Sequence, residues 1–212
     1  MYLEFALICA LTWIPSLYAS VAEYGGWRKP SVLGVDEVFA AFSSLAMVSL
    51  PIFLIWRNGE PFRKFGFRPF EWRDLVVAAV LVLGAVLLHI ASRSIIQIIG
   101  VQSGALTTIR IHHGFPLPVE APILLVAAFR EEIFYRAYAC ARMRDFGLNQ
   151  TRVAVLSALA FASVHLYQGW ALLPVHFFFG LMFAAVFLKF RSIWPLAVAH
   201  ASYNLLLLAG TL

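Results

Sequence analysis

The sequence predicts an all-α protein, a polytopic membrane helix bundle of about seven transmembrane helices. The first observation is composition: of 212 residues, 62% are hydrophobic and 13% are charged, whereas a soluble domain carries roughly a quarter charged residues. The second is a mean hydropathy of +0.83. The third is that apolar runs of about 20 residues, the length needed to cross a bilayer, recur along the chain.

The same observations limit domain count, cofactors and partners. We find no internal repeat and no low-complexity segment, so we treat residues 1–212 as a single integral-membrane domain. Cys9 and Cys140 both fall in apolar segments, which indicates neither a disulfide framework nor a metal motif, and we expect no cofactor. The first apolar segment lacks the basic start and small-residue cleavage pattern of a signal peptide, so we expect it to be retained.

The first two spans are predicted at about Tyr2–Ala22 and about Glu37–Trp56. Pro15 is expected to kink the first span, because proline lacks the backbone N–H that a helix interior needs. A short loop rich in glycine separates the two spans. After the second span comes the most basic stretch of the chain, residues 57–74.

The third span is predicted at about Leu75–Ala91. Just beyond it, the long side chain of Arg93 can extend its guanidinium to the membrane interface. Residues 94–100 are apolar but too short to span, and we expect them to lie along the membrane surface. The connection then continues to Pro116. It contains three residues that we place in a solvated loop: Arg110, His112 and His113.

The fourth span, about Pro118–Ala141, is followed by a basic loop. The fifth and sixth spans, about Val153–Tyr167 and about Trp170–Leu188, are joined by a tight turn at Gln168 and Gly169. The seventh span is about Ile193–Leu208.

The basic residues between the spans are distributed unevenly. One side of the membrane receives ten: Arg57, Arg63, Lys64, Arg68, Arg73, Arg142, Arg144, Arg152, Lys189 and Arg191. The other side receives three: Arg28, Lys29 and Arg110. The positive-inside rule then places the N-terminus in the cytoplasm. The net charge of +5 is explained by these basic loops on one side of the lipid bilayer. It does not indicate a nucleic-acid partner.

The fourth span holds charged side chains in a segment that should be apolar. Within seven residues it carries Arg130, Glu131, Glu132 and Arg136, and ionisable groups inside a membrane indicate function. Glu132 and Arg136 are four residues apart on a helix and can neutralise each other, either as structural support or as part of the chemistry. Glu131 has no partner within this motif. We therefore take Glu131 as the free carboxylate.

Polar residues on the later spans lie at a similar predicted depth. At ~1.5 Å per residue, Glu131, His165, His200 and Asn204 all fall roughly 12 to 20 Å from the cytoplasmic end of their spans, near the middle of a core ~30 Å thick. Taken together they predict one site inside the bundle. Three polar residues of the spans, considered singly, could also have only a packing role: His89, His176 and Asn204.

These side chains suit the hydrolysis of an amide by water. A carboxylate and a neutral imidazole on either side of a water molecule can take up its proton. A second histidine and an asparagine, such as His200 and Asn204, can donate to the oxyanion of a tetrahedral intermediate. Such a site needs neither a serine nor a cysteine nucleophile.

Three motifs resemble one known family. They are E-E-x-x-x-R (Glu131, Glu132, Arg136), F-x-x-x-H (Phe161, His165) and H-x-x-x-N (His200, Asn204), in this order on successive late spans. Together they resemble the CPBP family, which contains the CAAX prenyl proteases and the bacterial Abi, or bacteriocin-processing, proteins. The resemblance covers about residues 118–208.

The resemblance implies a glutamic intramembrane endopeptidase. It implies that Glu131 and His165 activate the water, that His200 and Asn204 hold the oxyanion, and that Glu132 with Arg136 supports the site. It assigns nothing to Arg130 or His176, and it implies no metal. The expected partner is a membrane-embedded or membrane-associated peptide or protein substrate, and the compact size suggests a prokaryotic cell membrane.

Three alternatives stay open at this point. Glu131, His165 and His200 could bind zinc in a metalloprotease, although H-E-x-x-H is absent. A non-catalytic immunity or scaffold protein could hold a peptide within the bundle. A proton-coupled carrier would also use buried glutamate and histidine, but we find none of the paired repeats that carriers show.

Overall fold

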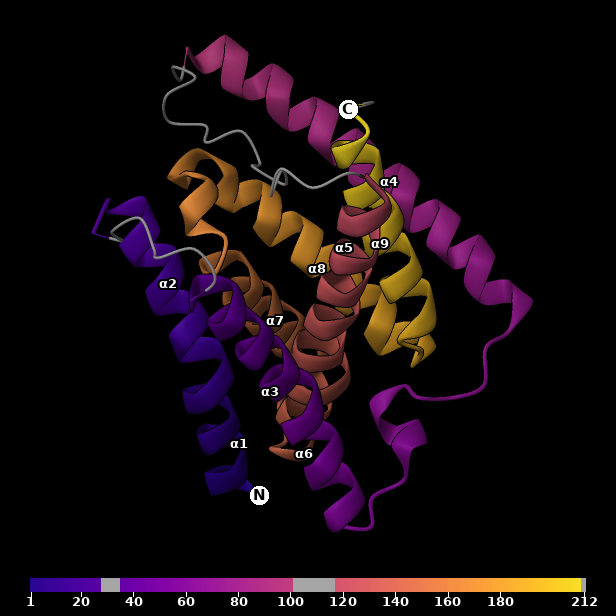
Figure 1. Cartoon of the computed structure of the whole chain (residues 1–212). Coiled ribbons are helices and arrows are strands. Elements are labelled where there is room, and N and C mark those ends of the chain that lie inside the picture. Colours follow the sequence, from indigo (N-terminus) through magenta and orange to yellow (C-terminus); the bar gives the residue numbers. More distant parts are fainter. Residues whose placement is uncertain (28–34, 101–116, 211–212) are drawn as a thin grey trace.

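The computed structural model describes residues 1–27, 35–100 and 117–210 (Figure 1). The described residues are almost entirely helical and contain no β-strand, which confirms the predicted all-α bundle. The elements are α1 (Tyr2–Ile8), η1 (Cys9–Trp13), α2 (Ile14–Tyr24), α3 (Val35–Arg57), η2 (Phe62–Phe65), α4 (Trp72–Ile99), α5 (Leu117–Glu131), η4 (Glu132–Cys140), α6 (Ala141–Asp145), α7 (Gln150–Ser163), η5 (Leu166–Gln168), η6 (Trp170–Leu172), α8 (Leu173–Phe190) and α9 (Trp194–Leu208).

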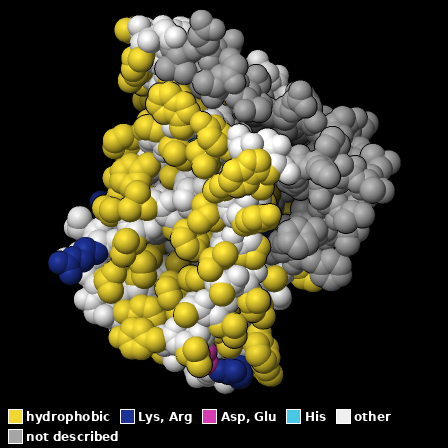
Figure 2. Space-filling view, turned by 90° about the vertical axis from the view of Figure 1, so that its left-hand side faces the viewer, with side chains coloured by type: hydrophobic (Ala, Val, Ile, Leu, Met, Phe, Trp, Pro, Cys, Tyr) yellow, Lys and Arg dark blue, Asp and Glu magenta, His cyan; other side chains and the backbone are white. Residues whose placement is uncertain are grey.

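Consecutive elements form seven helical segments in the described parts of the chain, in the positions predicted for the seven spans. Three of these segments are long and apolar enough to cross a membrane: Tyr2–Tyr24, Trp72–Ile99 and Trp170–Phe190. The segment that contains α5, η4 and α6 is long but charged, while α7 and α9 are only 14 and 15 residues long. Figure 2 shows one side of the molecule, where apolar side chains gather and a few basic ones lie at the margin. Such a surface fits contact with lipid.

The N-terminal segment is one continuous helix whose middle is irregular. The π-helical turn η1 ends directly before the first residues of α2, where Pro15 lies. Proline cannot donate the backbone hydrogen bond expected at its position, and a local widening of the helix accommodates the loss. The irregularity that we predicted at Pro15 therefore takes this form.

Helix α4 corrects the prediction for the third span. The sequence predicts that the span ends at about Ala91 and that residues 94–100 lie along the membrane surface, but α4 continues without a break to Ile99. A capping box between Glu71 and Asp74 fixes its start, and Gly100, with φ 72°, ends it. The sequence contains no proline or glycine between residues 91 and 99 that would stop the helix earlier. Arg110, His112 and His113 lie outside the described residues.

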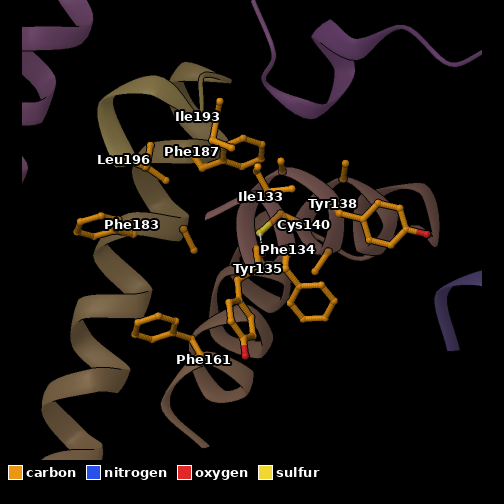
Figure 3. Packing of buried hydrophobic residues seen from close by; sticks show 14 of the residues in the cluster. Ile133, Phe134, Tyr135, Tyr138, Cys140, Phe161, Phe183, Phe187, Ile193 and Leu196 are labelled. Carbon is orange, nitrogen blue, oxygen red and sulfur yellow. Dashed lines mark hydrogen bonds between the residues drawn. The ribbon is translucent and has the colours of Figure 1, made fainter. Parts of the chain in front are cut away.

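The fourth segment forms the centre of the bundle. Every residue of η4 is buried, and its apolar side chains pack against α7, α8 and the start of α9 (Figure 3). Tyr135 makes an edge-to-face contact with Phe161 of α7, with ring centroids 5.5 Å apart. Nine successive residues adopt the π conformation here. This conformation is rare in proteins and is found frequently at functional sites.

The two basic loops that the charge count placed on the same side are in direct contact. The Glu60 carboxylate accepts from Nη1 of Arg142 at 2.9 Å and from Lys64 at 2.7 Å. Burial raises the pKa of Glu60, but the hydrogen bonds from Arg142 and Lys64 outweigh it and leave that pKa below its usual value. Glu4 pairs with Arg57, so the N-terminus lies on this side too. The orientation of this side toward the cytoplasm remains a prediction.

Candidate active site

Glu132 and Arg136 form the pair that their spacing predicts. Both side chains are fully buried, and Nη1 of Arg136 lies 3.3 Å from Oε1 of Glu132. The guanidinium also lies over the ring of Phe161, 4.4 Å from its centroid, an arrangement that stabilises a cation. Its Nη2 reaches the carbonyl oxygen of Gly180 at 3.5 Å. The arginine thus joins η4 to α7 and α8.

Gly180 allows α7 and α8 to approach closely beside this pair. A Cβ at this position would lie 3.0 Å from Cα of Ala158 and 3.2 Å from Phe161. Such contacts are tighter than protein packing normally tolerates, so a larger residue would push the helices apart. The glycine therefore keeps Phe161 close to the charged pair.

Glu131 is not the unpartnered carboxylate that we predicted. Nη2 of its neighbour Arg130 lies 3.0 Å from Oε1 of Glu131. The prediction was wrong because it considered only partners one helical turn away, whereas the adjacent arginine turns its side chain back to the carboxylate. The second oxygen, Oε2, lies 3.9 Å from Nε2 of His200. One oxygen of Glu131 is thus paired and the other faces a histidine.

His200 bridges the two glutamates of the motif. Its Nδ1 lies 2.8 Å from Oε1 of Glu132, while its Nε2 faces Glu131. An ionised carboxylate can only accept a hydrogen bond, so Nδ1 carries a proton and its N–H donates a hydrogen bond to Oε1 of Glu132. The rings of Phe161, Phe179 and Phe183 surround the imidazole, with centroids 5.2–6.1 Å away. The buried ring therefore has a fixed orientation.

His165 lies just beyond the helix on which we placed it. Helix α7 ends at Ser163, and His165 occupies the turn before η5, so the fifth span is shorter than predicted. The side chain still reaches Phe161, because its Nδ1 lies 2.8 Å from the carbonyl oxygen of that residue. A carbonyl can only accept, so Nδ1 carries the proton. In the neutral ring Nε2 is then unprotonated and can accept a proton.

His176 and His89 have the partners expected of histidines in a packed core. The ring of His176 stacks on His165 with centroids 4.3 Å apart, and its Nε2 lies 2.8 Å from Oε1 of Gln168. His89 pairs with the hydroxyl of Tyr203 at 3.0 Å. These contacts favour the packing interpretation for both residues.

Asn204 stands apart from the other predicted residues. It lies one helical turn after His200 on α9, so the two share a face. Its side chain is partly buried, and no hydrogen bond joins it to another residue in the described parts of the chain. The structure therefore brings together Glu131, Glu132, Arg136 and His200, but it does not join Asn204 to them.

A cavity of about 120 Å³ opens beside Glu131 and His165. This volume accommodates several water molecules. Its lining residues are Ser16, Met47, Arg130, Glu131, Tyr135, Val164, His165 and Tyr167. The cavity thus places a carboxylate and an imidazole beside the same small space. Its other wall comes from α2 and α3, in which the sequence predicts no part of the site.

The alternative of a zinc site gains no geometric support. Within residues 1–27, 35–100 and 117–210, no three His, Cys, Asp or Glu side chains are arranged to hold a metal ion. Glu131 and His200 approach each other, but His200 directs Nδ1 to Glu132.

Sequence reasoning missed Arg130 and the residues of α2 and α3 near the site. Arg130 carried a visible signal, since it is a charge inside a predicted span directly beside Glu131. Ser16 and Ser44 carried none, because single serines in apolar helices usually bond to their own backbone.

A comparison with protein families matches residues 114–206 to the family described as Type II CAAX prenyl endopeptidase Rce1-like. The matched region contains all three motifs that resembled this family. No curated protein and no solved structure matches the chain. The family resemblance stated from the sequence is thus confirmed over the part of the chain that carries Glu131, His165, His200 and Asn204.

Proposed function

Because residues 114–206 match the family described as Type II CAAX prenyl endopeptidase Rce1-like, we propose that the protein is an intramembrane glutamic endopeptidase. It hydrolyses a peptide bond in a membrane-associated peptide or protein. The observation that carries the proposal is that Glu131 and His165 line one cavity that is large enough for water.

In the first step Glu131 takes up one proton from a water molecule in this cavity, while the unprotonated Nε2 of His165 accepts a hydrogen bond from the same water. The water oxygen forms a bond to the carbonyl carbon of the substrate, and the electron pair of the C=O bond moves onto its oxygen. The oxyanion then re-forms the C=O bond as the C–N bond breaks, and the leaving nitrogen takes up the proton that Glu131 had accepted. The contact between His165 and Phe161 supports this role because it leaves Nε2 as the basic atom.

The proposed oxyanion site lies on α9. Nδ1 of His200 donates to Glu132, so a second donation from Nε2 to an oxyanion uses the doubly protonated ring. Glu132 can stabilise the doubly protonated ring of His200, because its negative charge lies next to that ring in the buried interior of the bundle. Asn204 supplies a neutral amide donor on the same face of the helix.

The proposal is tested by comparing cells that express the wild type with cells that express Glu131→Ala. We expect peptides released from membrane proteins to be present with the wild type and absent with the variant, as measured by mass spectrometry of the membrane peptidome. A chelator added to the purified wild type should leave cleavage unchanged, since no step uses a metal. Identical peptidomes would favour a non-catalytic protein, and inhibition by the chelator would revive the zinc site.

For the oxyanion site we expect His200→Ala and Asn204→Ala each to lower kcat by roughly 10²–10³ with little change in KM, because the donors act only in the transition state. The double variant should lose less than the product of the two single losses. Steady-state kinetics of the three proteins in lipid vesicles measure this. A raised KM with unchanged kcat would instead place this face of α9 in substrate binding.

A further inference from the structure

Arg130 connects two helices at the wall of the cavity. Its Nη1 donates to Oγ of Ser44 on α3 at 2.6 Å, and its Nη2 donates to Oε1 of Glu131 at 3.0 Å. The side chain is 22% exposed and belongs to the cavity lining. A guanidinium with two fixed contacts is held in one orientation, because its donors form a rigid planar fork.

This contact decides which oxygen of Glu131 is available. Oε1 is paired with Arg130, whereas Oε2 lies 3.9 Å from Nε2 of His200. A carboxylate with one oxygen fixed cannot rotate freely, and catalytic groups need such fixed geometry to act efficiently. Arg130 also places a positive charge beside Glu131, as Arg136 does beside Glu132.

We propose that Arg130 is a positioning residue that holds Glu131 toward the reacting water and is itself anchored by Ser44 of α3. Helix α3 lies outside the matched region, residues 114–206. The catalytic carboxylate is thus aimed by an early helix to which neither the motifs nor the family match assigns a role. The inference rests on the proposed function, since it presumes that Glu131 acts as the base.

The contacts favour positioning over direct binding of an acidic substrate group. Both terminal nitrogens of Arg130 are engaged, by Ser44 and by Glu131. Its Nε is buried and has no partner in the described parts of the chain, so it is not accessible from the cavity. A substrate carboxylate would have to displace one of the two existing contacts.

The test uses wild type, Arg130→Gln and Arg130→Lys in proteoliposomes with a fluorogenic prenylated CAAX peptide as the probe. We expect Arg130→Gln to lower kcat about 10- to 100-fold with KM nearly unchanged, because a misplaced catalytic group costs up to about 10² in rate. Arg130→Lys keeps the charge and should recover part of the loss. Arg152→Gln, at an exposed position of α7, is the matched control and should behave like the wild type. A raised KM with normal kcat, or no effect of Arg130→Gln, would overturn the proposal.

The anchor is tested with Ser44→Ala, for which we expect a several-fold loss of kcat. Ser49→Ala is the control on the same helix, because its hydroxyl donates to the backbone carbonyl of Leu45 at an exposed position. Adding Ser44→Ala to Arg130→Gln should lower kcat no further, since Ser44 acts through Arg130. A further loss of the same size in the double variant would contradict the anchoring role.

A second measurement separates this inference from the proposed function. If the wild type cleaves no more probe than Glu131→Gln does, the proposed activity on that probe fails, and thermal unfolding of the same variants still tests the contact. The losses in Tm caused by Ser44→Ala and Arg130→Gln should then be non-additive, because each change removes the same hydrogen bond. Additive losses would show that Ser44 does not hold Arg130.

Discussion

Replacement of Glu131 by glutamine is expected to abolish cleavage while the protein still inserts into membranes and purifies folded. Glutamine has nearly the same shape, and its amide oxygen can still accept from Arg130, which lies 3.0 Å from the carboxylate in the wild type. The amide cannot accept a proton from water, so the general base is lost. We expect kcat to fall by a factor of roughly 10²–10⁴ or more, because this factor is the typical contribution of a general base. The loss is measured as the rate of peptide release in proteoliposomes.

Glu4→Gln provides the control for this change. Glu4 pairs with Arg57 near the N-terminus, away from the cavity, and its side chain is 25% exposed. Exposed ion pairs contribute about 0–1 kcal/mol to stability, so this variant should fold and cleave normally. Near-normal turnover of Glu131→Gln would refute the glutamate mechanism. A loss of turnover in both variants would point to a general effect of the substitution on the protein.

The sequence was informative where chemistry forces a residue type into an unfavourable place. Two glutamates and an arginine in an apolar helix are costly unless they are paired or take part in chemistry, and the spacing of four residues predicted the pairing of Glu132 with Arg136. The later histidines followed from the same argument together with the estimated depth. The pairing of Glu132 with Arg136 is present in the structure at 3.3 Å.

Side-chain direction and helix ends were harder to predict. Whether Arg130 extends away from Glu131 or turns toward it depends on Ser44, which is 86 residues away in the sequence. Helix α7 ends at Ser163, where the sequence has no glycine or proline that would predict a helix end. Tertiary contacts determine this end. The π conformation of η4 also left no sequence signal. These features depend on packing between segments, which periodicity and propensity do not describe.

Loss of Arg136 should act mainly on stability. The residue is fully buried, and its removal leaves Glu132 charged, with His200 as its remaining polar partner among the residues that the structure describes. Breaking one side of a buried pair costs about 3–5 kcal/mol, a large part of the stability of most domains. We therefore expect Arg136→Ala to give little folded protein and no activity, as judged by yield and by thermal unfolding in detergent.

The double variant Glu132→Leu with Arg136→Met separates support from chemistry. Apolar side chains of similar size often replace a buried ion pair without loss of stability, so folded protein should return. Activity should remain low, because Nδ1 of His200 loses the oxygen that orients it, 2.8 Å away in the wild type. A well-folded but inactive Arg136→Ala protein would instead give Arg136 a direct role in catalysis. Recovery of full activity in the double variant would show that the Glu132–Arg136 pair is dispensable for aligning His200.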